Sequence, residues 1–189
     1  MIGQVEAVGD RVERVVFRVD GIPRGKGSMS TFMNPRTRRV QVRGDNPLTA
    51  TWQEAVAQVA RFTMGAHLPI DDAVEVFLFF RIVRPKGHWT DTGKVGSLWR
   101  DYPDRRSGGQ TVTYDVDKLE RAILDAMTCG GVYIDDSRVC DVVKKTRYAI
   151  PGQTLPGVDV EVVRLPPLEE SLRLPRPRGG TVIRRRPGG

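Results

Sequence analysis

Two pairs of aspartates flank a helical pattern in the second half of the sequence. Asp115 and Asp117 are two residues apart just before this pattern, and Asp135 and Asp136 follow it. In an extended chain, side chains two residues apart point to the same side, so Asp115 and Asp117 are expected to aim both carboxylates in one direction. Such a pair suits the binding of a divalent cation.

The segment between the two pairs predicts an amphipathic helix. Its apolar residues recur at helical spacing, whereas Lys118, Arg121 and Asp125 occupy the opposite, polar face. The members of the apolar stripe are Leu119, Ala122, Ile123, Ala126 and Met127. The helix is expected to stop near Gly130 and Gly131, because glycine readily adopts the conformation that ends helices.

A short strand over residues 132–134 would then carry Asp135 and Asp136 back towards the start of the helix, so that four carboxylates converge. Such a cluster needs cations for neutralisation, or one member must take up a proton. Hard oxygen ligands without a neighbouring histidine favour Mg²⁺, with Mn²⁺ as a substitute, over zinc. The pattern therefore predicts a magnesium site.

A purely structural interpretation of these aspartates stays open. Asp is a common helix N-cap, so Asp117 could simply satisfy free backbone N–H groups. Asp135 and Asp136 could simply form a turn. Both pairs in this order around a helix with basic residues on its polar face favour the metal site.

These residues also carry a family resemblance. The pattern Asp-x-Asp-Lys-Leu, a helix, and then Gly-Gly-Val-Tyr-x-Asp-Asp-x-x-Val resembles the RusA family of Holliday junction resolvases of bacteria and their phages. The segments Asn46-Pro47 and Pro85-Lys86 extend the resemblance, which covers most of residues 13–165. Its specificity lies in the spacing between the two acidic pairs.

The resemblance implies a Mg²⁺-dependent, homodimeric endonuclease whose metal ligands are Asp115, Asp117 and Asp136, with Asp135 nearby. Lys118 stands where an asparagine is common in the family, and Arg121 stands where a catalytic lysine is expected. Arginine keeps the positive charge but does not readily give up a proton. Arg121 is therefore expected to bind phosphate or stabilise transition-state charge instead of donating a proton.

The composition of the chain points to a polyanionic partner. With 189 residues the chain is long enough for one sizeable domain, and its 30 Lys and Arg residues exceed its 23 Asp and Glu residues. An excess of positive charge alone supports nonspecific attraction to nucleic acid, and solvated basic faces give the same excess. No signal peptide or membrane span is expected, so we predict a cytoplasmic protein, in the host cytoplasm if a phage encodes it.

The order of the expected elements predicts an α+β fold, in which a mixed β-sheet packs against two main helices. Strands are expected over residues 14–19, 73–83, 138–148 and 158–164, and a second helix over residues 48–64 with Trp52 in the core. Residues 34–43 favour a basic hairpin or an edge strand. The domain is expected to end at residue 165, and residues 166–189 form a basic tail that we predict to be mostly disordered.

Several basic residues are candidates for contacts with DNA phosphates. They are Arg24, Lys26, Arg38, Arg39, Lys118, Lys144 and Lys145. The glycine-rich loop around Lys26 lacks the spacing of a phosphate-binding P-loop, so no nucleotide cofactor is expected. The long connection over residues 84–113 is expected to face DNA or cover the active site, with plain disorder as the alternative.

The sequence as a whole favours a structure-selective endodeoxyribonuclease that resolves Holliday junctions and related branched DNA by paired phosphodiester hydrolysis. A homodimer would supply two equivalent active sites. A module of the same fold that binds branched DNA without cleaving it is one alternative. A phosphatase with an Asp-x-Asp nucleophile is another, although the residues before Asp115 make a poor apolar strand.

Overall fold

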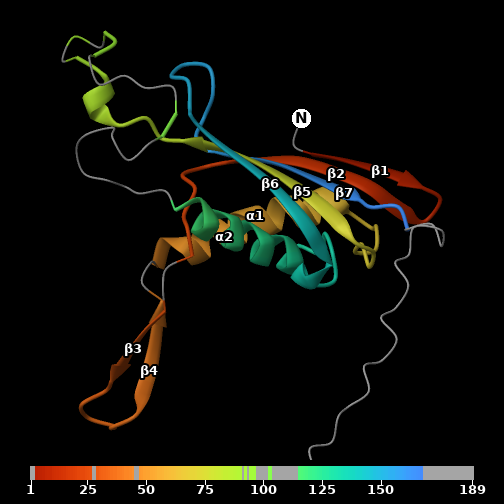
Figure 1. The fold of residues 1–189 in the computed structure, drawn as a ribbon, viewed down its shortest axis with the longest axis horizontal. Helices are drawn as coiled ribbons and strands as arrows, with labels where there is room; N and C mark the ends of the chain where they lie inside the picture. Colours follow the sequence, from red (N-terminus) through yellow and green to blue (C-terminus); the bar gives the residue numbers. More distant parts are fainter. Residues whose placement is uncertain are drawn as a thin grey trace, which may run out of the picture.

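The computed structural model describes residues 3–26, 29–44, 47–90, 92, 94–96, 102–103 and 115–167. In this part of the chain, a five-stranded sheet packs against two helices, and a two-stranded hairpin stands apart (Figure 1). The mixed sheet and the helices confirm the predicted α+β class. The proposed tail lies almost entirely outside the described residues, so the domain end at residue 165 stays a prediction.

The large sheet has the strand order β1-β2-β7-β5-β6. Its strands are β1 (Gly3–Val8), β2 (Arg11–Asp20), β5 (Val74–Ile82), β6 (Val139–Tyr148) and β7 (Gly157–Arg164). Strands β5 and β6 are parallel, whereas the other neighbours are antiparallel. Four of these strands were expected from the sequence. Strand β1 was not, because it is an edge strand whose residues are mostly exposed and lack a clear alternation.

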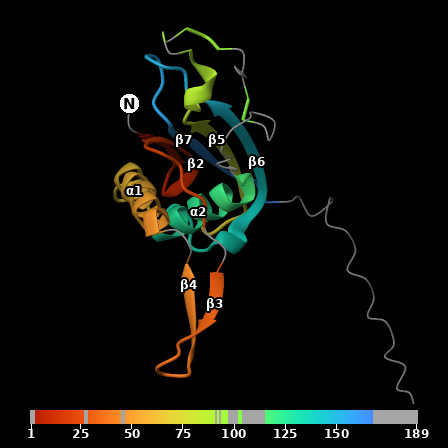
Figure 2. The ribbon, with the colours of Figure 1, turned by 90° about the vertical axis from the view of Figure 1, so that its left-hand side faces the viewer.

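Helices α1 (Pro47–Met64) and α2 (Val116–Cys129) cover one face of the sheet (Figures 1 and 2). Alternate residues of β5 are buried beneath them, and the expected apolar stripe of α2 is buried in full. Trp52 of α1 is only 4% exposed, which confirms its place in the core. Helix α2 ends immediately before Gly130 and Gly131, as predicted. Among the described helices, none is long and apolar enough to cross a membrane.

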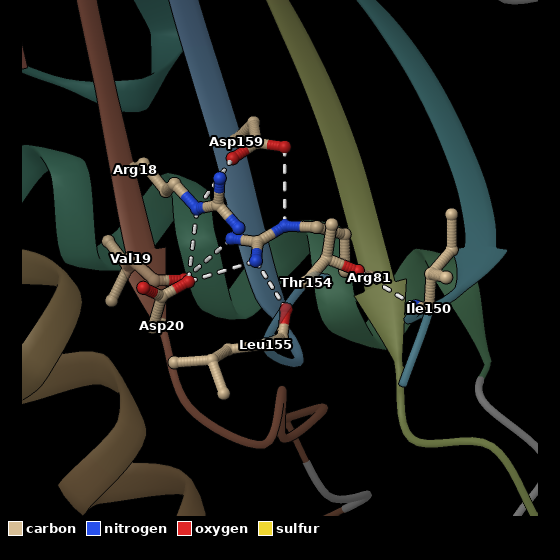
Figure 3. A network of polar contacts seen from close by, with 8 residues as sticks. All are labelled: Arg18, Val19, Asp20, Arg81, Ile150, Thr154, Leu155 and Asp159. Carbon is tan, nitrogen blue, oxygen red and sulfur yellow. Dashed lines mark hydrogen bonds and ion pairs between the residues drawn. The ribbon is translucent and has the colours of Figure 1, made fainter. Parts of the chain in front are cut away.

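The other face of the sheet is held by a buried arginine (Figure 3). Arg81 of β5 is 4% exposed, and its Nη1 donates to Asp20 Oδ1 of β2 at 2.9 Å and to the carbonyl oxygen of Leu155. Its Nε lies 3.3 Å from Asp159 Oδ2 of β7. Partial burial acts to raise the pKa of Asp20, but hydrogen bonds from Arg81 and Arg18 outweigh it and lower this pKa. One side chain thus ties β5 to two other strands.

Replacing Arg81 with alanine should lower the free energy of unfolding by about 3 kcal/mol, because the change removes a buried side chain and leaves Asp20 and Asp159 only the exposed cation of Arg18. Arg18→Ala is the matched control. Arg18 pairs with the same two carboxylates but is 43% exposed, so its loss should cost less than about 1 kcal/mol. Urea unfolding measures both, and equal costs for the two variants would contradict this role of Arg81.

Candidate active site along helix α2

Helix α2 begins earlier than the sequence indicated. Asp115 is its N-cap, and Oδ1 of Asp115 accepts a hydrogen bond from the backbone N–H of Asp117 at 3.2 Å. Asp117 therefore lies in the first helical turn, and the expected extended pair Asp115-Val116-Asp117 is wrong. The reason is local, because a carboxylate satisfies a free N–H group and favours the positive end of the helix.

Lysine 144 of β6 neutralises the start of α2. Lys144 Nζ donates to Asp117 Oδ1 at 2.5 Å and to Glu120 Oε2 at 2.5 Å. The hydrogen bond from Lys144 is the main cause that lowers the pKa of the Asp117 carboxyl, and the same bond raises the pKa of Lys144. Lys144 reaches the helix because β6 alternates, which places Lys144 on the helix side of the sheet and Lys145 on the other.

A second lysine reaches α2 from the loop after β2. Gly25 packs so closely on the helix that a Cβ atom at this position would lie 2.9 Å from Lys118 Cβ. Two hydrogen bonds hold the loop there, from Lys26 N to the carbonyl of Lys118 at 2.9 Å and from Thr49 Oγ1 to the carbonyl of Gly25 at 2.8 Å. This placement brings Lys26 Nζ to 2.6 Å from Asp125 Oδ2.

A cleft of about 580 Å³ opens beside this lysine, between α1, α2 and the short 3-10 helix η2 (Asp136–Arg138). Four acidic residues line it together with Lys26, namely Glu54, Asp125, Asp135 and Asp136. Asp135 caps η2, and its Oδ1 accepts a hydrogen bond from Ser137 N at 2.9 Å. Hydrogen bonding with Ser137 lowers the pKa of Asp135.

The two aspartate pairs do not converge within one chain. Asp115 caps the start of α2, whereas Asp135 and Asp136 share the cleft with residues from its last turns. A helix of 14 residues is about 21 Å long. The expected strand over residues 132–134 is reduced to a single bridge between Tyr133 and Ile70. Among the described residues, no three His, Cys, Asp or Glu side chains are arranged to hold a metal ion. The predicted convergence is therefore wrong for this conformation.

The other predicted basic residues are spread over several surfaces. Arg121 is exposed on α2, and its charge helps to lower the pKa of Asp117. Lys118 Nζ lies 3.9 Å from Asp115 Oδ2. Arg24 is half-buried in the loop after β2, and Lys145 is exposed on β6. Arg38 and Arg39 are exposed in the turn that joins the two strands of the hairpin.

The described parts of the long connection do not support a role at the site. Its first residues form the 3-10 helix η1 (Lys86–His88), where His88 is 1% exposed and its ring packs against Tyr148 with the centroids 5.0 Å apart. Arg84 also lies over the Tyr148 ring. Most of residues 97–114 lie outside the described part of the chain, so the expected DNA-facing loop stays a prediction.

Three polar residues of the site were missed by sequence reasoning. Asp125 was assigned only to the polar face of the helix, but it receives hydrogen bonds from both Lys26 and Gln53. Glu120 shares Lys144 with Asp117. A usable signal was present for Glu120, because it follows Asp117 by three residues and therefore lies on the same side of the helix. Gln53 gave no signal, since it comes from a distant helix.

Comparison with known proteins identifies the class of this fold and site. The family model for endodeoxyribonuclease RusA matches residues 28–163, which span the hairpin, both helices and the strands β5, β6 and β7. No significant match was found among curated proteins. The match covers most of the chain, so the protein belongs to the RusA family of Holliday junction resolvases, which are nucleases that act on DNA. The predicted family membership is confirmed.

The contact between Lys144 and Asp117 predicts that the pKa of Asp117 changes when Lys144 is removed. In Lys144→Ala the pKa of the Asp117 carboxyl should rise towards its ordinary value, as followed by side-chain carboxyl NMR during a pH titration. Because the folded-state pKa is lowered, the contact stabilises the folded protein above the unfolded pKa of about 3.9, and this contribution disappears as the pH falls through the folded value. Lys145→Ala, one residue along β6, should leave Asp117 unchanged. An unchanged Asp117 titration in Lys144→Ala would rule out the contact.

Proposed function

We propose that this protein is a Mg²⁺-dependent, structure-selective endodeoxyribonuclease that resolves Holliday junctions and related branched DNA by paired phosphodiester hydrolysis. The observation that carries the proposal is the family match across the whole of α2, whose polar face holds carboxylates beside basic residues. The enzyme would act in the cytoplasm, which is the cytoplasm of the host cell if a phage encodes the chain.

The carboxylates of α2 fit a hard divalent cation in their chemistry. Asp115 and Asp117 both offer exposed oxygen donors at the start of the helix, which suits Mg²⁺ or Mn²⁺. The resemblance adds Asp136, with Asp135 beside it, to the same ligand set. Asp136 lies near the other end of α2, so within one chain it could join this set only after a change of position. Bound Mg²⁺ would activate water and stabilise charge on the leaving oxygen.

The residues around the carboxylates would bind and orient the DNA backbone. Arg121 is exposed one turn after Asp117, where its guanidinium can stabilise the developing charge of a phosphate. Lys118 of α2 and Lys26 of the loop packed on α2 can exchange their carboxylate partners for phosphate oxygens. A junction presents two equivalent strands, so we also propose a homodimer with a mass in light scattering about twice the 21.1 kDa of one chain.

A DNA-binding module without cleavage is the second candidate, and one observation favours it. The carboxylates Asp115, Asp117 and Asp125 each lie within 4.0 Å of a lysine, which balances their charge without a metal ion. Cleavage assays with and without Mg²⁺ separate the two candidates. The phosphatase alternative is weaker, because Asp115 caps helix α2 and the sequence before it is a poor match to an apolar strand.

Asp117→Asn should abolish cutting while preserving the binding of four-way junctions, because it removes the charge of a metal ligand and leaves the basic residues in place. A gel-based nicking assay and a gel-shift assay measure the two properties. Asp10→Asn, an exposed aspartate in the turn between β1 and β2, serves as the control and should cut normally. Near wild-type cutting by Asp117→Asn would remove Asp117 from the metal site.

Arg121→Ala should lower the single-turnover cleavage rate by about a hundredfold or more with little change in melting temperature, since loss of one charge-stabilising group has effects of this size. Arg121→Lys should keep much of the activity, because the cation remains. Arg61→Ala removes an exposed arginine of α1 as the control. If Arg121→Ala cut as fast as the wild type, Arg121 would be only a solvated surface residue.

A further inference from the structure

The hairpin formed by β3 (Met29–Met33) and β4 (Val40–Gly44) projects away from the domain as a separate arm (Figures 1 and 2). The two strands pair with each other in antiparallel register, and among the described residues they belong to no larger sheet. A two-stranded hairpin on its own is only marginally stable in water. The turn between the two strands lies far from the helices and the large sheet (Figures 1 and 2), so we look for its role in contacts with a partner.

The end of the arm is an ordered turn. Asn34 Oδ1 accepts hydrogen bonds from the backbone N–H groups of Arg36 at 2.9 Å and Thr37 at 3.3 Å. The backbone of Asn34 also pairs with Arg39 and Arg38, at 3.0 and 2.8 Å. Arg38 adopts a φ of 53°, a left-handed conformation that is uncommon for a residue with a side chain. The turn therefore presents its side chains from a defined backbone.

Two kinds of side chain meet at this turn. Arg36, Arg38 and Arg39 are exposed and supply positive charge. Directly behind them, Met33 and Val40 face each other across the two strands and are 66% and 65% exposed. Cross-strand partners lie close together on one face, so these residues form a small apolar pair in water. Cations beside an exposed apolar pair match phosphates beside the faces of unstacked bases.

We propose that the β3–β4 arm enters the branch point of a DNA junction, where Met33 and Val40 pack against unstacked bases while the arginines of the turn hold the flanking phosphates. This inference rests on the proposed function. Apolar side chains act in this way when they wedge between base steps, and a two-stranded ribbon also fits a DNA groove. The three exposed arginines of the turn favour a polyanion as the occupant over a second copy of the arm, which would carry the same positive charge.

The test uses the full chain without divalent metal and a four-way junction that carries 2-aminopurine beside the crossover. The wild type should prefer the junction to a linear duplex and should raise the fluorescence as the base unstacks. The double variant Met33→Gln with Val40→Thr keeps strand-compatible side chains of similar length. It should lose the fluorescence rise and about tenfold of its junction preference, while its affinity for the duplex stays within about twofold.

Two controls separate apolar from electrostatic effects. Arg38→Gln with Arg39→Gln should weaken binding to junction and duplex alike and reduce the salt dependence of both, since phosphate contacts carry no selectivity for branches. Val8→Thr changes a valine of β1 that is 73% exposed, and should alter neither property.

The outcomes show separately whether the role proposed for the arm is wrong and whether the proposed function is wrong. A Met33 and Val40 double variant that keeps both the junction preference and the fluorescence rise would overturn the role of the arm and leave the proposed function intact. A change in its mass in light scattering, with equal losses on junction and duplex, would indicate an arm exchanged between copies and would also overturn the proposal. A wild type without junction preference would overturn both.

Discussion

Repulsion among the carboxylates of α2 is the constraint on which the described site depends. Asp117, Glu120 and Asp125 share one short helix, and Asp115 caps it. Three lysines from different elements pair with these carboxylates. They are Lys118 of α2 itself, Lys144 of β6 and Lys26 of the loop after β2. The parallel pairing of β5 with β6 places Lys144, and the close packing of Gly25 on α2 places Lys26. The packing of the fold therefore determines which lysines balance the negative charge of the helix.

The same lysines give the site a way to couple DNA and metal binding under the proposed function. A lysine that turns to a DNA phosphate leaves its carboxylate without a cation, and that carboxylate then gains affinity for a divalent ion. By linkage, bound metal would strengthen DNA binding by the same factor. These contacts are exposed or half-buried, so each contributes little to stability and can be exchanged at small cost. Lys26 and Asp125 form one of these exchangeable pairs, and both residues line the acidic cleft.

Local patterns in the sequence were sufficient for most elements but not for the geometry of the site. The apolar stripe of α2, helix α1 and strand β5 could be predicted from apolar periodicity, because the apolar residues that recur at regular spacing are the ones that the fold buries. The predicted direction of the Asp115 and Asp117 side chains was wrong. A capping hydrogen bond fixes the backbone there as the start of a helix, so the periodicity of a strand does not apply. The pairing of Lys26 with Asp125, 99 residues apart, depends on tertiary packing that no local pattern encodes. Arg81 was placed in a strand but its burial was not foreseen, since its two aspartates come from other strands.

The proposed function depends on one property, which is cleavage of branched DNA in the presence of Mg²⁺. The purified protein is incubated with a synthetic four-way junction, a Y-shaped branch and a linear duplex, each with and without Mg²⁺, and the cut strands are mapped on sequencing gels. We expect symmetric paired cuts in the four-way junction, little cutting of the duplex, and no cutting without Mg²⁺. Equal cutting of junction and duplex, or tight junction binding with no cutting in Mg²⁺, would contradict the proposed function.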